Sequence, residues 1–136
     1  AFRSGKDRTM PLATIVCMLA LLEYVALGLV VGAARGKYGV EAPATSGHPE
    51  FDRRYRVHYN TLEQLVVFVP ALFAFAWFLS DLWAAALGLV FVVGRALYAR
   101  SYIADPASRG PGMALTFLPN LVLLFGGLVG AVLALF

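Results

Sequence analysis

The chain has 136 residues, of which 60% are hydrophobic and 14% are charged, and its mean hydropathy is +0.76. This charged fraction is little more than half that of a typical soluble domain, which excludes a soluble single-domain enzyme. A single cysteine, Cys17, excludes an intramolecular disulfide framework and a cysteine-rich metal site. The net charge of +3 comes without a long basic run, which argues against nucleic acid as a partner. We therefore expect an integral membrane protein.

Residues 11–34 form the first predicted span and carry one formal charge, Glu23. As a helix this run would be roughly 36 Å long, enough to cross a hydrocarbon core with some tilt. A cleaved signal peptide is not expected, because the apolar run is long and no clear cleavage site follows it. The tail before the span, residues 1–10, is polar. Met10 is a candidate natural first residue, so we leave the tail out of the functional interpretation.

Residues 65–79 and 82–94 are apolar runs that would each be only roughly 20 Å long as helices. Both are too short for a hydrocarbon core of about 30 Å, so each must be extended at its far end by polar sequence. Only Ser80 and Asp81 separate the runs, which predicts a tight antiparallel hairpin. The predicted fold is all-α, a bundle of four transmembrane helices in one domain, residues 11–136, with spans at about 11–34, 56–79, 82–102 and 113–136.

The last span is uncharged and contains glycines that permit close helix approach, so we expect it to serve packing. The segment 36–52 is too rich in Pro, Gly, Ser and Thr to be predicted as helix. Basic residues gather in the loop after the first span and around Arg109, in the loop before the last one. The positive-inside rule assigns these two loops to the cytoplasm, with both termini facing outward.

Two stripes of polar side chains lie on the polar extensions of the middle helices, each at the spacing of one helix face. The stripes are Arg56, Asn60 and Glu63 on the second helix and Arg95, Tyr98 and Tyr102 on the third. Antiparallel pairing places both stripes at one side of the membrane and at similar depth, where charge is costly and is usually retained for function. Together they could bind a small zwitterion through charge-assisted hydrogen bonds.

A structural interpretation carries equal weight at this point. Arg56, Glu63 and Arg95 could neutralise one another, with the tyrosines as an interfacial aromatic belt. Glu23 has no partner on its own helix, so we expect it to make an interhelical structural contact, for which Arg95 is a candidate. His58 lacks a second ligand at suitable spacing, which argues against a metal site.

The segments PEFDRRYRVHYNTLE and GRALYARSYIADPASRGPG resemble the two signature segments of the MAPEG family, the membrane-associated proteins of eicosanoid and glutathione metabolism. The order of the four spans matches that family as well, and the resemblance runs from about Pro11 to the end of the chain. It implies a homotrimer of four-helix protomers that binds glutathione, as co-substrate and without a metal, between neighbouring protomers near the cytoplasmic side.

The resemblance also implies a set of glutathione contacts. They are Arg56, Asn60 and Glu63 on the second helix, Tyr98 and Tyr102 on the third, Arg109 in the following loop, and Arg35 and His58 from the neighbouring protomer. Two departures from the family pattern argue against leukotriene synthesis. Gln64 stands where some members have an aromatic residue, and Gly36 stands where they have a second basic residue. Both leave glutathione binding in place.

The activity implied by the resemblance is conjugation of glutathione to lipophilic electrophiles, a detoxification reaction, with glutathione-dependent peroxide reduction as a further candidate. Only a few per cent of a free thiol is thiolate at neutral pH, and a cation beside the sulfur raises that fraction. Arg109 is the predicted catalytic residue, acting as an electrostatic stabiliser because arginine stays protonated.

Two other classes of function are alternatives. One is a non-catalytic membrane scaffold or regulatory protein that keeps the family site without turnover. The other is a small transporter, which is poorly supported because the charged layer is confined to one side and the last span is uncharged.

Overall fold

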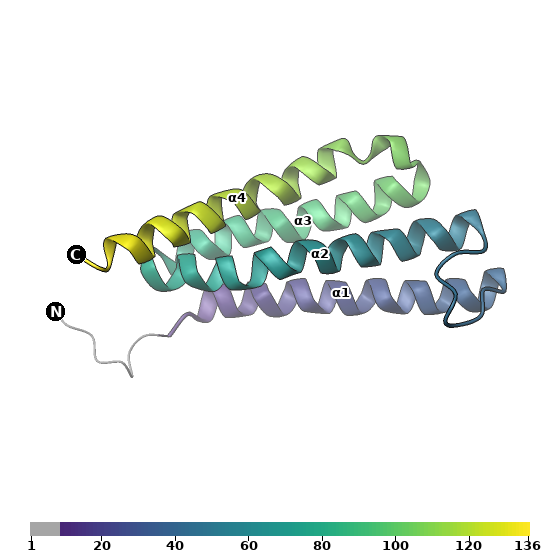
Figure 1. Cartoon of the computed structure of the whole chain (residues 1–136), viewed down its shortest axis with the longest axis horizontal. Helices are drawn as coiled ribbons and strands as arrows, with labels where there is room; N and C mark the ends of the chain where they lie inside the picture. Colours follow the sequence, from purple (N-terminus) through teal and green to yellow (C-terminus); the bar gives the residue numbers. More distant parts are fainter. Residues whose placement is uncertain (1–8) are drawn as a thin grey trace.

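The computed structural model describes residues 9–136, so most of the polar tail predicted at residues 1–10 lies outside the described residues. The described part forms four long helices joined by short connections (Figure 1). They are α1 (Pro11–Tyr38), α2 (Pro49–Phe78), α3 (Asp81–Ala104) and α4 (Gly110–Leu133), with a short 3-10 helix, η2 (Pro106–Ser108), before α4. All four are long and apolar enough to cross a membrane. The prediction of an all-α four-helix bundle is confirmed.

The helices extend further toward the α1–α2 loop than expected, so the prediction that residues 36–52 are non-helical is wrong at both ends. α1 continues to Tyr38 and stops at Gly39, whose φ of 69° is the left-handed conformation that glycine adopts without strain. α2 already begins at Pro49, because proline fits the first position of a helix. The His48 side chain caps this start by accepting a hydrogen bond from the Glu50 amide at 3.1 Å.

The two central helices, α2 and α3, pack against each other and against both outer helices, α1 and α4. In Figure 1 the start of α1, the α2–α3 turn and the C-terminus lie at one end of the bundle. We call this the turn end. The α1–α2 loop and the connection through η2 lie at the opposite end, which we call the loop end.

Small residues allow the helices to approach closely. A Cβ atom on Gly94 would lie 2.7 Å from the Leu115 backbone, and one on Gly112 would lie 2.5 Å from the Tyr98 backbone. Such distances leave room only for glycine, so α3 and α4 meet backbone to backbone near the loop end. At the turn end, a Cβ on Gly130 would lie 2.8 Å from the Phe78 Cβ.

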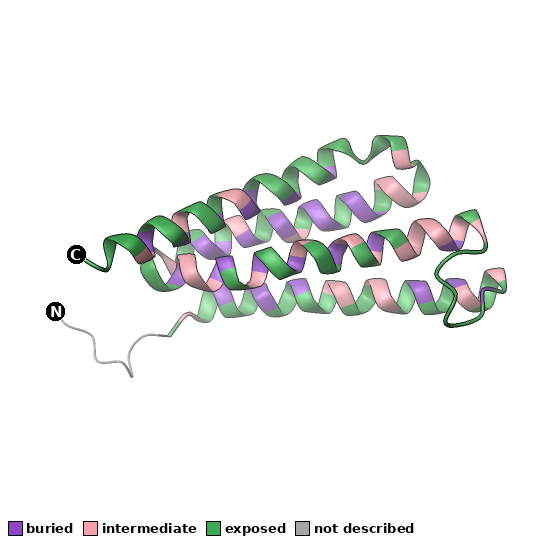
Figure 2. Ribbon diagram, in the orientation of Figure 1, coloured by how far each residue is buried: buried purple, intermediate pink, exposed green. Residues whose placement is uncertain are grey.

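Apolar side chains cover both the inside and the outside of the bundle. The core includes Phe68 and Phe91, whose rings stack with centroids 3.9 Å apart. Figure 2 shows exposed residues along the outer faces of the helices, and these include large apolar side chains such as Leu29, which is 71% exposed. An outer surface of this kind suits lipid rather than water as the surrounding solvent.

The turn end is closed by a cap between helices. The Asp81 carboxylate accepts hydrogen bonds from the amides of Leu12, at 3.1 Å, and Ala13, at 2.8 Å. These amides belong to the first turn of α1, whose own capping residue, Met10, offers no side-chain hydrogen bond. A carboxylate at a helix N-terminus satisfies free N–H groups and complements the helix dipole, so Asp81 fastens α1 to the start of α3.

Candidate functional site

A polar cavity of about 380 Å³ opens toward the loop end, between α2, α3 and the start of α4. Its lining residues are Arg56, Asn60, Glu63, Tyr98, Tyr102, Arg109 and Met113. Except for Arg35 and His58, every residue predicted for the glutathione site lines this cavity. Polar side chains from three separate segments therefore meet in one place.

The charged groups of the cavity are not held in structural ion pairs. Within residues 9–136 the two ion pairs both involve Glu50, with Arg53 at 3.7 Å and Arg54 at 2.9 Å, on the first turns of α2. Arg56 and Glu63 pair neither with each other nor with Arg95. The interpretation in which these three residues neutralise one another is therefore wrong, and the cavity offers a cation and a carboxylate to a ligand.

The two tyrosines of α3 form one wall of the cavity. Their rings stack with centroids 5.6 Å apart, as expected for residues four apart on a helix. The Tyr98 hydroxyl accepts a hydrogen bond from Asn60 Nδ2 at 2.6 Å, which joins α3 to α2. Because this hydroxyl accepts from Asn60, its own proton remains available for a ligand in the cavity.

Arg109 reaches the cavity from the tight connection between α3 and α4. Asp105 begins this connection by accepting from the Ala107 amide at 3.1 Å, and the Ser108 hydroxyl donates to the Ser101 carbonyl at 3.0 Å. Arg109 itself donates to the Pro106 carbonyl at 3.3 Å and directly precedes α4. The positive end of the α4 dipole thus adds to the charge of Arg109, and this corner of the cavity favours an anion.

Arg95 departs from the predicted third-helix stripe. It is 0% exposed and does not line the cavity. Its Nη2 donates to Thr61 Oγ1 at 2.8 Å, and its Cζ lies 4.1 Å from the centroid of the Tyr98 ring. Helical spacing placed Arg95 beside Tyr98 correctly, but spacing alone does not say which neighbouring helix a long side chain turns toward. Arg95 turns inward to α2.

The interhelical contact expected for Glu23 is with Arg95, but it is electrostatic and not a hydrogen bond or ion pair. The Glu23 Oε1 atom is buried and accepts no hydrogen bond from residues 9–136, and Glu23 takes part in neither ion pair there. It still interacts electrostatically with Arg95 across the α1–α3 interface. Polar atoms of both side chains stay buried without a hydrogen-bond partner in residues 9–136, among them Arg95 Nε and Nη1.

Arg35 and His58 make contacts outside the cavity. Arg35, near the end of α1, donates to the Ala44 carbonyl at 2.7 Å and lies 4.9 Å from the Phe51 ring centroid, so it holds the α1–α2 loop. His58 stacks on Tyr24 with ring centroids 4.4 Å apart, on the side of α2 that faces α1. Their predicted role at a neighbouring protomer's site stays a prediction.

Two buried polar residues that join the helices were missed by sequence reasoning. Thr61 is fully buried, and its hydroxyl donates to the Val57 carbonyl at 2.8 Å while accepting from Arg95. Asn120 of α4 donates to the Gln64 side chain at 3.1 Å. Gln64 is the position at which some family members have an aromatic residue. The available signal was a polar residue inside an apolar helix, which calls for a partner on another helix.

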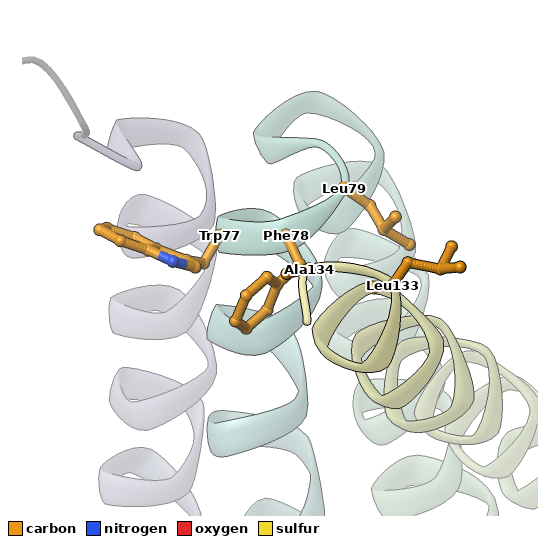
Figure 3. A pocket seen from close by; sticks show the side chains of 6 residues that line it. Trp77, Phe78, Leu79, Leu133 and Ala134 are labelled. Carbon is orange, nitrogen blue, oxygen red and sulfur yellow. The ribbon is translucent and has the colours of Figure 1, made fainter. Parts of the chain in front are cut away.

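A second cavity, of about 340 Å³, lies at the turn end (Figure 3). The side chains shown there come from the end of α2, among them Trp77 and Phe78, and from the end of α4, among them Leu133. None of its lining residues is ionisable. The chemistry that a charged ligand requires is thus concentrated in the loop-end cavity.

Among residues 9–136, no group of three or more His, Cys, Asp and Glu side chains is arranged to hold a metal.

Comparison with known proteins places this arrangement among related chains. The model of the MAPEG family matches residues 13–129. The chain is 44% identical over 115 residues to an uncharacterized protein of Synechocystis sp., covering 85% of this chain and 84% of that one. It is 35% identical to microsomal glutathione S-transferase 2 of Homo sapiens, covering 77% and 71% of the two chains. It is 34% identical to leukotriene C4 synthase of Rattus norvegicus, covering 76% and 69%.

Proposed function

The chain belongs to the MAPEG family, and on that premise we propose that it is an integral membrane enzyme that uses glutathione. More specifically, we propose a glutathione transferase that conjugates glutathione to lipophilic electrophiles. The observation that carries this proposal is the loop-end cavity, which collects unpaired charges of both signs from residues that the family resemblance had singled out. The names of the transferase and synthase relatives support the same chemistry.

The proposed binding mode follows from the charges of glutathione, which carries two carboxylates, one ammonium group and a thiol. Arg56 suits a carboxylate through paired N–H donors, and Glu63 suits the ammonium group. Asn60, Tyr98 and Tyr102 supply hydrogen-bonding groups along the same wall. Such contacts gain strength in a partly desolvated site, so a small zwitterion is a better match than a neutral ligand.

Arg109 is proposed as the catalytic residue. Its guanidinium and the N-terminus of α4 both favour negative charge at one corner of the cavity, which suits the thiolate form of glutathione. The thiolate then attacks the electrophilic carbon, a carbon–sulfur bond forms, and the leaving group departs with the electron pair of the bond that breaks. Arginine remains protonated throughout and acts by charge.

An electrophile dissolved in the membrane can approach from the apolar outer surface. Met113 lines the polar cavity, and Leu115, on the next part of α4, lines an apolar cavity of about 300 Å³ together with Leu89, Val90 and Val93 of α3. An apolar cavity between the same two helices, α3 and α4, supports a lipophilic second substrate. Peroxide reduction by the same thiolate is a further proposed activity.

We also propose a homotrimer with the loop end on the cytoplasmic side. The trimer would bring Arg35 and His58 of one protomer to the cavity of the next. Crosslinking in mild detergent should stop at three protomers, and a stable monomer that retains glutathione binding would overturn the intersubunit site. For orientation, single cysteines in residues 39–48 of a Cys17→Ser background should react only with reagent that reaches the cytoplasm.

A conjugation assay tests the proposed function directly. Purified protein in detergent is mixed with glutathione and a chloronitroaromatic acceptor, and the thioether product is followed by absorbance. We expect glutathione-dependent product formation above the uncatalysed rate, and a parallel assay with an organic hydroperoxide tests peroxide reduction. Glutathione binding without turnover on a broad panel of acceptors would instead support the non-catalytic scaffold.

A further inference from the structure

We infer that Arg95 is a positioning residue for Tyr98, which it holds from behind and polarises so that the hydroxyl becomes a stronger hydrogen-bond donor to glutathione. This inference rests on the proposed function. It concerns a residue that lies outside the binding cavity and acts through another side chain. Four observations carry it: the burial of Arg95, its anchoring by Thr61, its place over the Tyr98 ring, and the hydrogen bond that orients the Tyr98 hydroxyl.

The first step is that Arg95 has a fixed position. It is 0% exposed, and Nη2 donates to Thr61 Oγ1 at 2.8 Å. Thr61 is itself fully buried and tied to the Val57 carbonyl at 2.8 Å, within the same helix. A guanidinium with such an anchor has little freedom to turn toward the cavity, so direct contact with a ligand there is excluded by its burial.

The second step is that this fixed cation lies on the face of a tyrosine that lines the cavity. The Arg95 Cζ is 4.1 Å from the Tyr98 ring centroid, well within the distance of a cation–π interaction. Tyr98 is 1% exposed, so water does not screen this contact effectively. The contact holds the ring in place and draws electron density from it, which strengthens the hydroxyl as a donor.

The third step concerns the direction of the Tyr98 proton. Asn60 Nδ2 donates to the Tyr98 oxygen at 2.6 Å, which occupies an acceptor position and leaves the hydroxyl proton for another partner. Since Tyr98 lines the cavity, that partner is an anionic or polar group of the bound ligand. Asn60 and Arg95 thus act on Tyr98 from two sides, one through its oxygen and the other through its ring.

Charge balance supports a role for Arg95 beyond neutralising an acid. The acidic group that interacts with it is Glu23 of α1, yet the two make no ion pair within residues 9–136. Arg95 Nε and Nη1 also donate to no partner there. A buried guanidinium is costly in a membrane helix, and packing alone would be served by an apolar side chain of similar size.

A double-mutant cycle tests the inference through glutathione affinity. Arg95→Gln removes the cation and keeps an amide that can reach Thr61. Tyr98→Phe keeps the ring on which Arg95 stacks and removes only the hydroxyl. An effect of Arg95 through the hydroxyl therefore disappears in the Tyr98→Phe background, whereas a purely structural effect persists there.

We expect Arg95→Gln to raise the Kd for glutathione by about 3- to 30-fold, the range that cation–π interactions cover. In the Tyr98→Phe background the same substitution should change Kd by less than about twofold. Arg95→Lys keeps the charge without the planar fork and should recover part of the affinity. Arg100→Gln, an exposed position on the same helix, is the matched control and should leave Kd unchanged.

Equal losses in both backgrounds, or no loss in either, would overturn the inference while leaving the proposed function intact. If the wild-type protein fails to bind glutathione, the proposed function is overturned, and the inference falls with it. If Arg95→Gln does not yield folded protein, the cycle is run with Thr61→Val, which removes the anchor of the guanidinium. The same criterion then applies: an effect on Kd that depends on the Tyr98 hydroxyl supports the inference, and one that does not overturns it.

Discussion

The two ends of the bundle use their polar residues in opposite ways. At the turn end the Asp81 carboxylate is fully engaged, since it accepts from two backbone amides of α1. At the loop end Arg56 and Glu63 line a cavity without an ion pair to any residue in 9–136. The carboxylate at the turn end is thus engaged within the protomer. The two charged side chains at the loop end remain available for the ligand proposed above.

Glycines that allow close helix approach also serve different purposes at the two ends of the bundle. At the turn end, Gly130 lets α4 approach Phe78 of α2, and the result is an apolar contact. At the loop end, Gly112 lets α4 approach the backbone of Tyr98, and the result is a wall of the polar cavity. Close helix approach therefore builds the fold at one end and shapes the candidate site at the other. The comparison can be tested by substitutions: those at the loop end should weaken glutathione binding, whereas the one at the turn end should change stability alone.

The largest effect is expected for Arg109→Ala. If Arg109 stabilises the thiolate, its loss should lower kcat by about 100- to 1,000-fold, the effect of removing one preorganised charge-stabilising group. Glutathione affinity should fall much less, because the interaction is strongest with the ionised sulfur that reacts. Steady-state kinetics with thiolate absorbance across pH checks this, and thiolate and rate should recover together as pH rises. Unchanged turnover would show that Arg109 is only a surface charge.

The second largest effect is expected when one of the charged side chains of α2 that line the cavity is removed. Arg56→Ala or Glu63→Gln should weaken glutathione binding by about 10- to 100-fold, because each removes a charge-assisted hydrogen bond. The ligand-free thermal stability should change little, since neither residue has an ion-pair partner within residues 9–136 to leave behind. Calorimetric binding and thermal unfolding measured on the same samples separate the two effects. A collapse of ligand-free stability with either variant would restore the structural interpretation.

A third test concerns the contact of α4 with α3. Gly112→Ala places a methyl group where 2.5 Å separates it from the Tyr98 backbone, so the helices must move apart. Overpacking of this kind costs about 1–3 kcal/mol, and displacement of Tyr98 should weaken glutathione binding as well. Gly32→Ala is the matched control, because nothing lies within 4 Å of its added methyl group. Equal behaviour of the two variants would contradict the close packing.

The smallest effect is expected at the turn end. Asp81→Ala removes the cap of α1 and should lower the free energy of unfolding by about 1 kcal/mol. Glutathione affinity should be unchanged, because Asp81 lies at the opposite end from the cavity (Figure 1). Thermal unfolding in detergent and a binding isotherm check both statements. Loss of affinity without loss of stability would show that the two ends do not divide their roles in this way.

Much of the fold could be predicted because hydrophobicity and helical spacing are local properties. The i, i+4 and i+7 spacing of Arg56, Asn60 and Glu63 placed them on one face, and the structure brings that face to the cavity. Other features depend on contacts between distant residues. Asp81 caps amides that precede it by 69 and 68 residues in the chain. The inward orientation of Arg95 depends on its hydrogen bond to Thr61 across the α2–α3 interface.

Local chemistry also misled the prediction at one point. The content of Pro, Gly, Ser and Thr argued against helix over residues 36–52. Pro49, one of the two prolines there, nevertheless lies in the first turn of α2, where its missing N–H would be unpaired in any case. The helix start was signalled by His48 before Pro49, with the acidic Glu50 and Asp52 in the first turn. The position of a proline in the helix, and not the residue type alone, therefore decides whether it interrupts the helix or begins it.

The central claim is that the unpaired charges at the loop end bind glutathione. Its most direct test is a calorimetric titration of glutathione into the wild-type protein in mild detergent, with Glu63→Gln and Asp81→Ala measured alongside. We predict saturable binding to the wild-type protein, the same affinity for Asp81→Ala, and a strongly weakened affinity for Glu63→Gln. Absence of saturable binding to the wild-type protein, or equal affinity in all three proteins, would contradict the account.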